Sequence, residues 1–126
     1  MSFDRTKPEI DFPGDEPPAD LVIEDLIEGD GPAATAGQTV SAHYVGVAHS
    51  TGEEFDASWN RGAPLDFQLG VGRVIPGWDR GIEGMKVGGR RRLVIPPHLA
   101  YGDHGAGSAI APGETLIFVV DLVDVR

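Results

Sequence analysis

The feature that most constrains this chain is its density of residues that interrupt helices. Eighteen glycines and ten prolines make up about 22% of the 126 residues, whereas an average chain has roughly 12%. Glycine and proline both weaken a helix interior, so a helical bundle is disfavoured and short strands joined by tight turns are expected. A chain of this length holds one domain with one hydrophobic core.

Negative charge is concentrated near the N-terminus. The first 30 residues hold ten acidic residues against Arg5 and Lys7, so they carry −8 of the net charge of −10. The first 19 residues also contain four prolines, and such a segment cannot bury enough apolar area to offset its ordering entropy. We therefore predict an acidic, proline-rich extended arm over 1–19 and a folded domain over 20–126. The arm is either a solvated tail or is held against the domain by Phe3, Ile10 and Phe12.

Several absent features narrow the class of protein. The chain has no cysteine, which excludes disulfides and thiolate chemistry. It has no apolar run near the ~20 residues of a membrane span, and its N-terminus lacks the apolar stretch of a secretory signal. The negative charge disfavours nucleic acid and anionic membranes as partners. We expect a cytoplasmic monomer that has neither as a partner.

Alternation of side chains predicts several strands. In the segment 40–49, Val40, Ala42 and Tyr44 lie on one face, and His43 and Val45 lie on the other. The segment 115–125 is the longest strand candidate, and shorter ones fall at 21–26, 54–57, 64–69 and 90–95. Antiparallel neighbours are expected because short turns join several of them.

One helix is predicted. Pro76 suits a first helical position, and Trp78, Ile82 and Met85 follow at the spacing of one apolar stripe. The pair Gly88-Gly89 is expected to end it. The fold class is therefore α+β, with an antiparallel sheet of about five strands packed on one short α-helix.

The usual catalytic constellations are poorly represented. His43 and His49 lie six residues apart on one strand face, roughly 20 Å, so they cannot share a metal ion. No phosphate-binding loop or nucleophile elbow is complete. We expect no metal and no cofactor. What remains is a set of aromatic residues on different elements, which either fill the core or line an open apolar pocket: Tyr44, Phe55, Phe67, Trp78, Tyr101 and Phe118.

Six segments, in order and spacing, resemble the FKBP family of peptidyl-prolyl cis-trans isomerases. The resemblance covers about residues 21–126. Any one segment is weak evidence, but the six together are highly specific. They are VSAHYVG (40–46), GEEFDASWNR (52–61), GVGRVIPG (70–77), GMKVGG (84–89), IPPHLAYG (95–102) and PGETLIFVVDL (112–122).

The resemblance implies a twisted antiparallel sheet half-wrapped around one short helix, with the active pocket between helix and sheet. By resemblance, Trp78 is the pocket floor, and the rim is formed by Tyr101 and Ile110. Asp56 resembles a buried acid that is held by Arg61 and the Tyr44 hydroxyl. The Ile75 N–H and the Tyr101 hydroxyl resemble donors to a bound carbonyl. The implied pocket walls are Tyr44, Phe55, Val74, Ile75 and Phe118.

The resemblance also implies an activity and its partners. The activity is that of a rotamase, which turns X–Pro peptide bonds and assists protein folding, with Tyr101, Asp56, Trp78 and Phe118 as catalytic residues. The implied partners are proline-containing polypeptides and the macrolides tacrolimus and rapamycin. Leu65 stands where vertebrate members often have phenylalanine, and Ala106 replaces a bulkier loop residue, so substrate preference and drug affinity should differ. The alternatives are a non-catalytic peptide-binding or chaperone module with the same pocket, and an interaction protein that uses its acidic arm.

Overall fold

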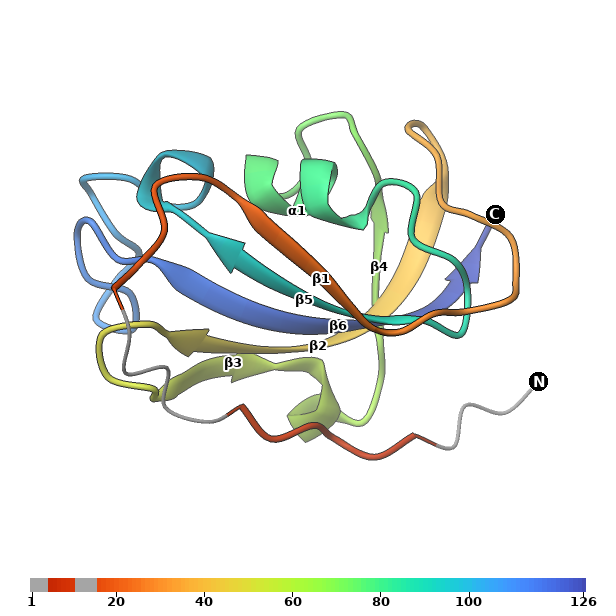
Figure 1. The fold of residues 1–126 in the computed structure, drawn as a ribbon, viewed down its shortest axis with the longest axis horizontal. Coiled ribbons are helices and arrows are strands. Elements are labelled where there is room, and N and C mark those ends of the chain that lie inside the picture. Colours follow the sequence, from red (N-terminus) through yellow and green to blue (C-terminus); the bar gives the residue numbers. More distant parts are fainter. Residues whose placement is uncertain (1–4, 11–15) are drawn as a thin grey trace.

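The strands form one antiparallel sheet in the computed structural model, which describes residues 5–10 and 16–126 (Figure 1). Five strands lie in the order β1-β5-β6-β2-β3, and β4 pairs with another part of β2. The predicted α+β class is confirmed, with six strands in the described residues. The strands are β1 (Val22–Ile27), β2 (Thr39–Ala48), β3 (Glu54–Ala57), β4 (Leu65–Gln68), β5 (Arg90–Ile95) and β6 (Leu116–Val125).

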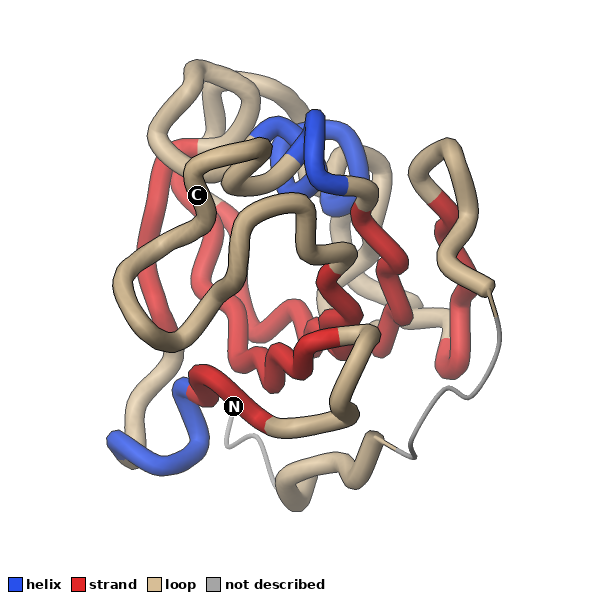
Figure 2. The backbone as a smooth tube through the Cα atoms, turned by 90° about the vertical axis from the view of Figure 1, so that its left-hand side faces the viewer, coloured by secondary structure: helices blue, strands red, loops and turns tan. Residues whose placement is uncertain are grey.

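The long strands β2 and β6 form the centre of the sheet, and their side chains alternate between two faces as predicted. The inner face, toward the helix, carries Val40, Ala42 and Tyr44 and belongs to the main core. The outer face carries Val45 and Val47 of β2, which pack in a second, smaller cluster with Ala57, Val94 and Ile117. Figure 2 shows the strands as a curved layer with α1 above it.

The strands β3 and β4 share one edge of β2. The pairing of β3 covers Val45–Val47, and that of β4 covers Thr39–Ala42. Between them the chain leaves the sheet and forms a 3-10 helix, η1 (Ser58–Arg61). This interruption leaves His43 and Tyr44 without a strand partner on that side.

The helix α1 (Pro76–Ile82) begins at the predicted proline. It packs against β5 so closely that a side chain at either of two positions would have to displace its neighbours. A Cβ atom on Gly77 would lie 2.4 Å from Ile95, and one on Gly81 would lie 2.7 Å from Leu93. In the described residues, no helix is long and apolar enough to cross a membrane.

The predicted end of the helix at Gly88-Gly89 is wrong. The helix ends at Ile82, because Gly84 adopts φ +83° and its N–H bonds to the Ala34 carbonyl instead of continuing the helix. Met85 still packs in the main core, although it lies outside the helix. The apolar spacing of Trp78, Ile82 and Met85 therefore identified core residues correctly, but the helix covers only the first two of them.

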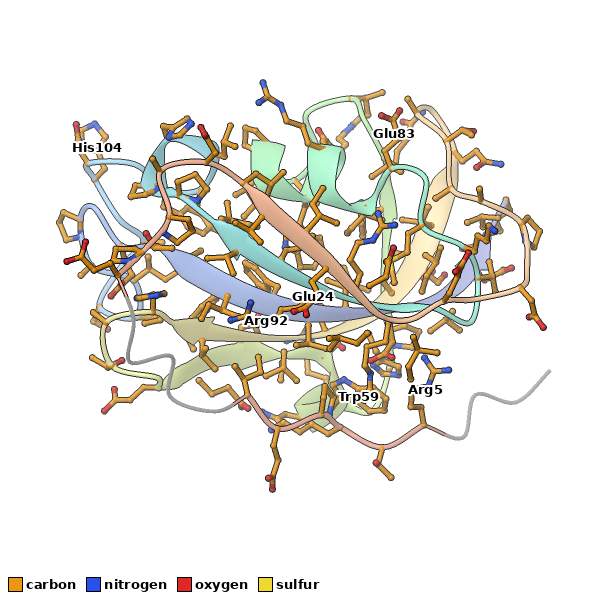
Figure 3. All side chains as sticks on the ribbon, in the orientation of Figure 1. Arg5, Glu24, Trp59, Glu83, Arg92 and His104 are labelled. Carbon is orange, nitrogen blue, oxygen red and sulfur yellow. The ribbon has the colours of Figure 1, made fainter. Side chains whose placement is uncertain are left out.

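Residues 5–10 of the N-terminal arm lie on the side of the sheet away from α1 (Figure 1). Residues 5–10 run below β2 and β3 in Figure 1, and Figure 3 shows Arg5 and Trp59 on this same side. Ile10 packs against the outer-face cluster, as does Trp59. Phe3 and Phe12, the other two expected contacts, lie outside the described residues.

Candidate active site

A cleft of about 200 Å³ opens where α1 faces the strands β2, β3 and β6. Its lining is mostly aromatic and aliphatic, with one carboxylate and one guanidinium. The lining residues are Tyr44, Phe55, Asp56, Leu65, Arg73, Val74, Ile75, Trp78, Tyr101 and Phe118. A concave, mainly apolar site with a few polar groups is typical of a small-ligand or catalytic site.

Trp78 is the centre of the aromatic part. Its side chain is only 4% exposed and meets the rings of Tyr44 and Phe118 edge-on, at centroid distances of 4.9 and 5.2 Å. Such edge-to-face pairs contribute about 0.5–1.5 kcal/mol each beyond their buried area. The rings therefore fix one another before any ligand is present.

Gly46 makes room for these rings in the middle of β2. A Cβ atom at this position would lie 2.6 Å from Cζ of Phe55 and 2.7 Å from Cε1 of Phe118. Phe55 and Phe118 also meet edge-on, with 5.5 Å between their centroids. The glycine thus lets two aromatic side chains from neighbouring strands reach the same wall of the cleft.

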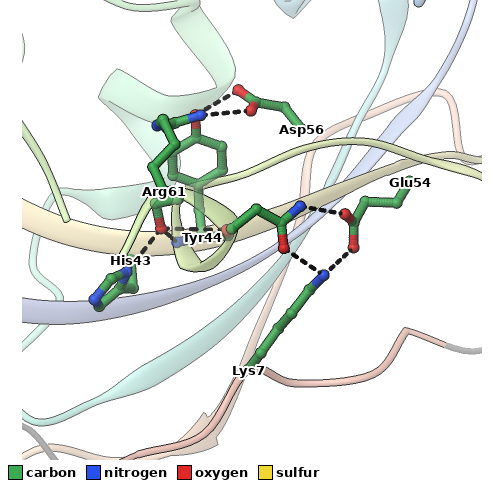
Figure 4. A network of polar contacts seen from close by, with 8 residues as sticks. Lys7, His43, Tyr44, Glu54, Asp56 and Arg61 are labelled. Carbon is green, nitrogen blue, oxygen red and sulfur yellow. Dashed lines mark hydrogen bonds and ion pairs between the residues drawn. The ribbon is translucent and has the colours of Figure 1, made fainter. Parts of the chain in front are cut away.

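A triangle of hydrogen bonds joins Tyr44, Asp56 and Arg61 at one corner of the cleft (Figure 4). The Tyr44 hydroxyl donates to Asp56 Oδ2 at 2.5 Å, and Arg61 Nη1 donates to Asp56 Oδ1 at 2.8 Å. Arg61 Nη2 donates to the Tyr44 oxygen at 2.8 Å. Each of the three groups therefore orients the other two.

The same triangle sets the charges of the corner. Partial burial alone would raise the pKa of Asp56, but the hydrogen bonds from Tyr44 and Arg61 outweigh it, so the pKa is lowered. Burial raises the pKa of the Tyr44 phenol, and the hydrogen bond to Asp56 adds to the rise. At neutral pH the corner holds a carboxylate and a neutral phenol, with the guanidinium compensating the charge.

Ser58 supports Tyr44 from the gap between β3 and β4. Its fully buried hydroxyl accepts the Tyr44 N–H at 2.7 Å and lies 2.8 Å from Nδ1 of His43. The His43 ring stacks on Trp59 with 4.1 Å between centroids, and burial lowers the pKa of this histidine. The serine replaces the missing strand partner of Tyr44, a role that no sequence motif signalled.

The loop from Gly70 to Ile75 borders the opposite side of the cleft. The Asp79 carboxylate anchors it by accepting the N–H groups of Gly70 at 2.8 Å and Gly72 at 3.1 Å. The Ile75 carbonyl accepts from the Trp78 N–H at the start of α1, at 2.9 Å. Within the described residues, the Ile75 N–H makes no hydrogen bond.

Nine of the eleven residues predicted for the site line this cleft. Arg61 is not among the lining residues, but it donates hydrogen bonds to Tyr44 and Asp56, which are. Ile110 packs in the main core at 5% exposure and is not among the lining residues. Tyr101 is 41% exposed at the start of the long loop. Sequence reasoning missed Arg73, because an arginine in an exposed glycine-rich loop has no periodicity that assigns it a direction.

The fold and the cleft define the class: an α+β domain with one antiparallel sheet, one short helix and a mainly aromatic and aliphatic cleft between them. Comparison with known sequences gives the family. The family model for FKBP-type peptidyl-prolyl cis-trans isomerase matches residues 31–123. An FK506-binding protein of Streptomyces anulatus is 78% identical over 120 residues, which cover 94% of this chain and 97% of the relative. A probable FK506-binding protein of Corynebacterium glutamicum is 52% identical over 117 residues, covering 93% and 97%.

Solved structures agree with the sequence comparison. The crystal structure of AtFKBP13 is 44% identical with a TM-score of 0.78, and the match covers 84% of this chain and 93% of that one. The structure of FkpA from Escherichia coli is also 44% identical, with a TM-score of 0.77 and coverage of 84% and 48%. The chain belongs to the family of FKBP-type peptidyl-prolyl cis-trans isomerases.

Proposed function

We propose that this cleft catalyses the rotation of X–Pro peptide bonds and that the protein assists the folding of proline-containing chains. The observation that supports this most is the cleft over Trp78, because its volume of about 200 Å³ and its mainly apolar lining would suit a small apolar ring. The proline ring would sit on the Trp78 indole between Tyr44, Phe55 and Phe118. Family membership supports the same reaction.

The reaction needs no covalent step. The barrier to rotation is roughly 18–20 kcal/mol, because the twisted amide loses its resonance. A twisted amide has a less polar carbonyl than a planar amide, so it loses less hydration when it enters an apolar site. Such a site therefore stabilises the twisted form relative to the planar form. Each ~1.4 kcal/mol of such preference raises the rate tenfold. The aromatic lining of the cleft meets this requirement.

The polar groups of the cleft are proposed to hold the chain on either side of the proline. The Ile75 N–H is unused within the described residues, so it can donate to a substrate carbonyl at no internal cost. The Tyr101 hydroxyl, on the exposed rim, is proposed as a second donor. Asp56 contributes a negative field at the rotating bond or serves only to orient Tyr44 and Arg61.

We also propose that the cleft binds the macrolides tacrolimus and rapamycin. The names of the curated relatives support this ligand class. Leu65 lines the cleft with an aliphatic side chain in place of an aromatic ring, so the affinity should differ from that of vertebrate members. We further propose that the protein acts as a cytoplasmic monomer, which sedimentation and cell fractionation can check.

The deciding experiment is isomerisation of an X–Pro tetrapeptide by the full chain, with and without tacrolimus. The proposal expects acceleration over the uncatalysed exchange of tens to hundreds of seconds, and inhibition by the drug. The absence of any acceleration would overturn it. Drug binding without turnover would instead favour a non-catalytic peptide-binding module with the same cleft.

A further inference from the structure

Residues 5–10, here called the strap, cross the outer face of the sheet and contact several separate elements. The strap lies outside the region matched by the family model. It contacts β6 through Arg5, and it contacts β3 and η1 through Lys7. Arg90 of β5 donates to the Thr6 carbonyl at 3.0 Å. A solvated tail would not make contacts of this kind at successive residues.

One end of the strap is fixed at a buried charge. Asp121 of β6 is fully buried, and its Oδ1 accepts hydrogen bonds from Arg5 at 2.9 Å and Arg90 at 2.8 Å. Arg5 also donates to the Gly88 carbonyl at 2.8 Å. A buried carboxylate needs such compensation, so the position of Arg5 is strongly determined.

The middle of the strap contacts β3 and η1, the segment that carries Asp56 and Arg61 of the cleft's polar corner. Lys7 Nζ lies 2.8 Å from Glu54 Oε1 and donates to Asn60 Oδ1 at 3.0 Å. Asn60 in turn donates to Glu54 Oε2 at 3.0 Å, which closes a ring of three side chains (Figure 4). The hydrogen bond from Lys7 is the main reason why the pKa of Glu54 is lowered.

Glu54 and Asn60, the two side chains that bind Lys7, lie close in sequence to the polar residues of the cleft. Glu54 precedes Asp56 by two positions on β3, and Asn60 is the neighbour of Arg61 in η1. The backbone pairing of β3 with β2 covers only three positions, with a register shift between Gly46 and Val47, so side-chain contacts supply much of what holds this segment. At the end of the strap, Ile10 packs against the outer-face cluster, as does Trp59 of η1.

We propose that the strap positions β3 and η1, and that Lys7 is a positioning residue for the isomerase reaction proposed above. Lys7 and Asn60 hold the outer side of this segment while Asp56 and Arg61 act on its inner side. Release of the strap lets the segment move away from β2 and loosens the triangle with Tyr44. The inference rests on the proposed function for its activity readout only.

The test compares Lys7→Met with Lys86→Met in the full chain. Lys86 also forms an exposed ion pair, with Glu28 at 3.3 Å, in the turn between α1 and β5, so the charge change is matched. Lys7→Met is expected to lower kcat/KM for an X–Pro peptide about two- to fourfold, the range that such exposed pairs provide. Lys86→Met should leave it unchanged, and Lys7→Arg should restore most of it.

Amide hydrogen exchange over residues 54–61 gives a second readout that needs no activity. Exchange should accelerate in Lys7→Met and not in Lys86→Met. A Lys7→Met enzyme with the wild-type kcat/KM would overturn the positioning role, and equal exchange in both variants would overturn the strap itself. If the wild type proved inactive, the proposed function would fail and the exchange comparison alone would decide about the strap.

Discussion

Asp56 shows, at the scale of a single residue, how neighbours decide the chemistry of a side chain. The carboxylate is only partly buried, and burial alone would make it easier to protonate. Tyr44 and Arg61 reverse this by donating to both of its oxygens. The acid therefore stays ionised at the edge of an apolar cleft, where a charge acts over a longer distance than in water.

We predict that Asp56→Asn lowers kcat/KM and also flattens the loss of stability in acid. Because the pKa is lowered in the folded state, Asp56 stabilises the fold above its unfolded pKa of roughly 3.9, and this is lost as the pH falls through the folded value. Urea midpoints at about pH 7 and pH 3 should differ less in the variant than in the wild type.

Asp66→Asn is the control for this prediction. The pKa of Asp66 is also lowered, by the Ser41 hydroxyl and then Arg126, but this acid does not line the cleft. Asp66→Asn should reduce the difference in urea midpoint between about pH 7 and pH 3 without changing kcat/KM for the X–Pro peptide. If Asp56→Asn behaved in the same way, Asp56 would have no role in the reaction beyond stability.

We predict that Tyr101→Phe lowers kcat/KM by about two- to tenfold, as expected for one hydrogen bond of about 0.5–1.5 kcal/mol. The thermal midpoint should not change, because the residue is exposed and outside the main core. A tetrapeptide assay with thermal unfolding alongside measures both quantities. An unaltered rate would remove the hydroxyl from the mechanism.

At the scale of elements, the helix depends on packing and not on its own propensity. It has seven residues, two of which are glycines facing β5. Isolated helices of this length are not stable in water. The close approach to Ile95 and Leu93 supplies the stability and places Trp78 under the cleft.

We predict that Gly77→Ala destabilises the protein, although alanine is the better helix former by about 1 kcal/mol. The new methyl group would meet three atoms of the buried Ile95 within 3 Å, and such overpacking costs about 1–3 kcal/mol. Arg80→Ala, on the exposed side of the same helix, should be nearly neutral. A gain of stability in urea unfolding of Gly77→Ala would contradict this view of the packing.

The same element shows what sequence patterns could and could not predict. Pro76 fixed the start of the helix because proline constrains its own backbone locally. The end was wrong because the φ of Gly84 and its bond to Ala34 arise from tertiary contacts. The faces of β2 were predicted correctly, since alternation is local. The support of Tyr44 by Ser58 was not, since it depends on a gap between two strands distant from each other along the chain.

At the scale of the whole molecule, the N-terminal strap packs back against the sheet and contacts β3, β5 and β6. The sequence left open whether the acidic arm is a solvated tail or is held against the domain by Phe3, Ile10 and Phe12. Of these three residues, Ile10 packs against the outer-face cluster. The two basic residues of the arm make further contacts that the composition did not indicate: Arg5 with Asp121 and Lys7 with Glu54. Composition could not reveal this, because a buried acid on β6 only becomes visible as a partner once the sheet has formed.

We predict that Arg5→Met destabilises the fold by about 1–3 kcal/mol, because the buried Asp121 then keeps only one of its two guanidinium partners. Arg126→Met is the control. Arg126 pairs with Asp66 and Asp124, whose side chains are more than half exposed, so its loss should cost under about 1 kcal/mol. Equal urea midpoints for the two variants would show that Arg5 does not stabilise the domain.

The division of one sheet edge between β3 and β4 has a consequence for solubility. Each of these strands has four residues, and η1 separates them, so this edge offers no long row of free backbone groups to a foreign strand. At the other edge, β1 carries Glu24 and Asp25, and its register shifts between Asp25 and Ile27. Both edges of the sheet are therefore poor templates for cross-β stacking. This protects the protein from aggregation, because its proposed substrates are unfolded chains whose extended segments could otherwise pair with an open edge.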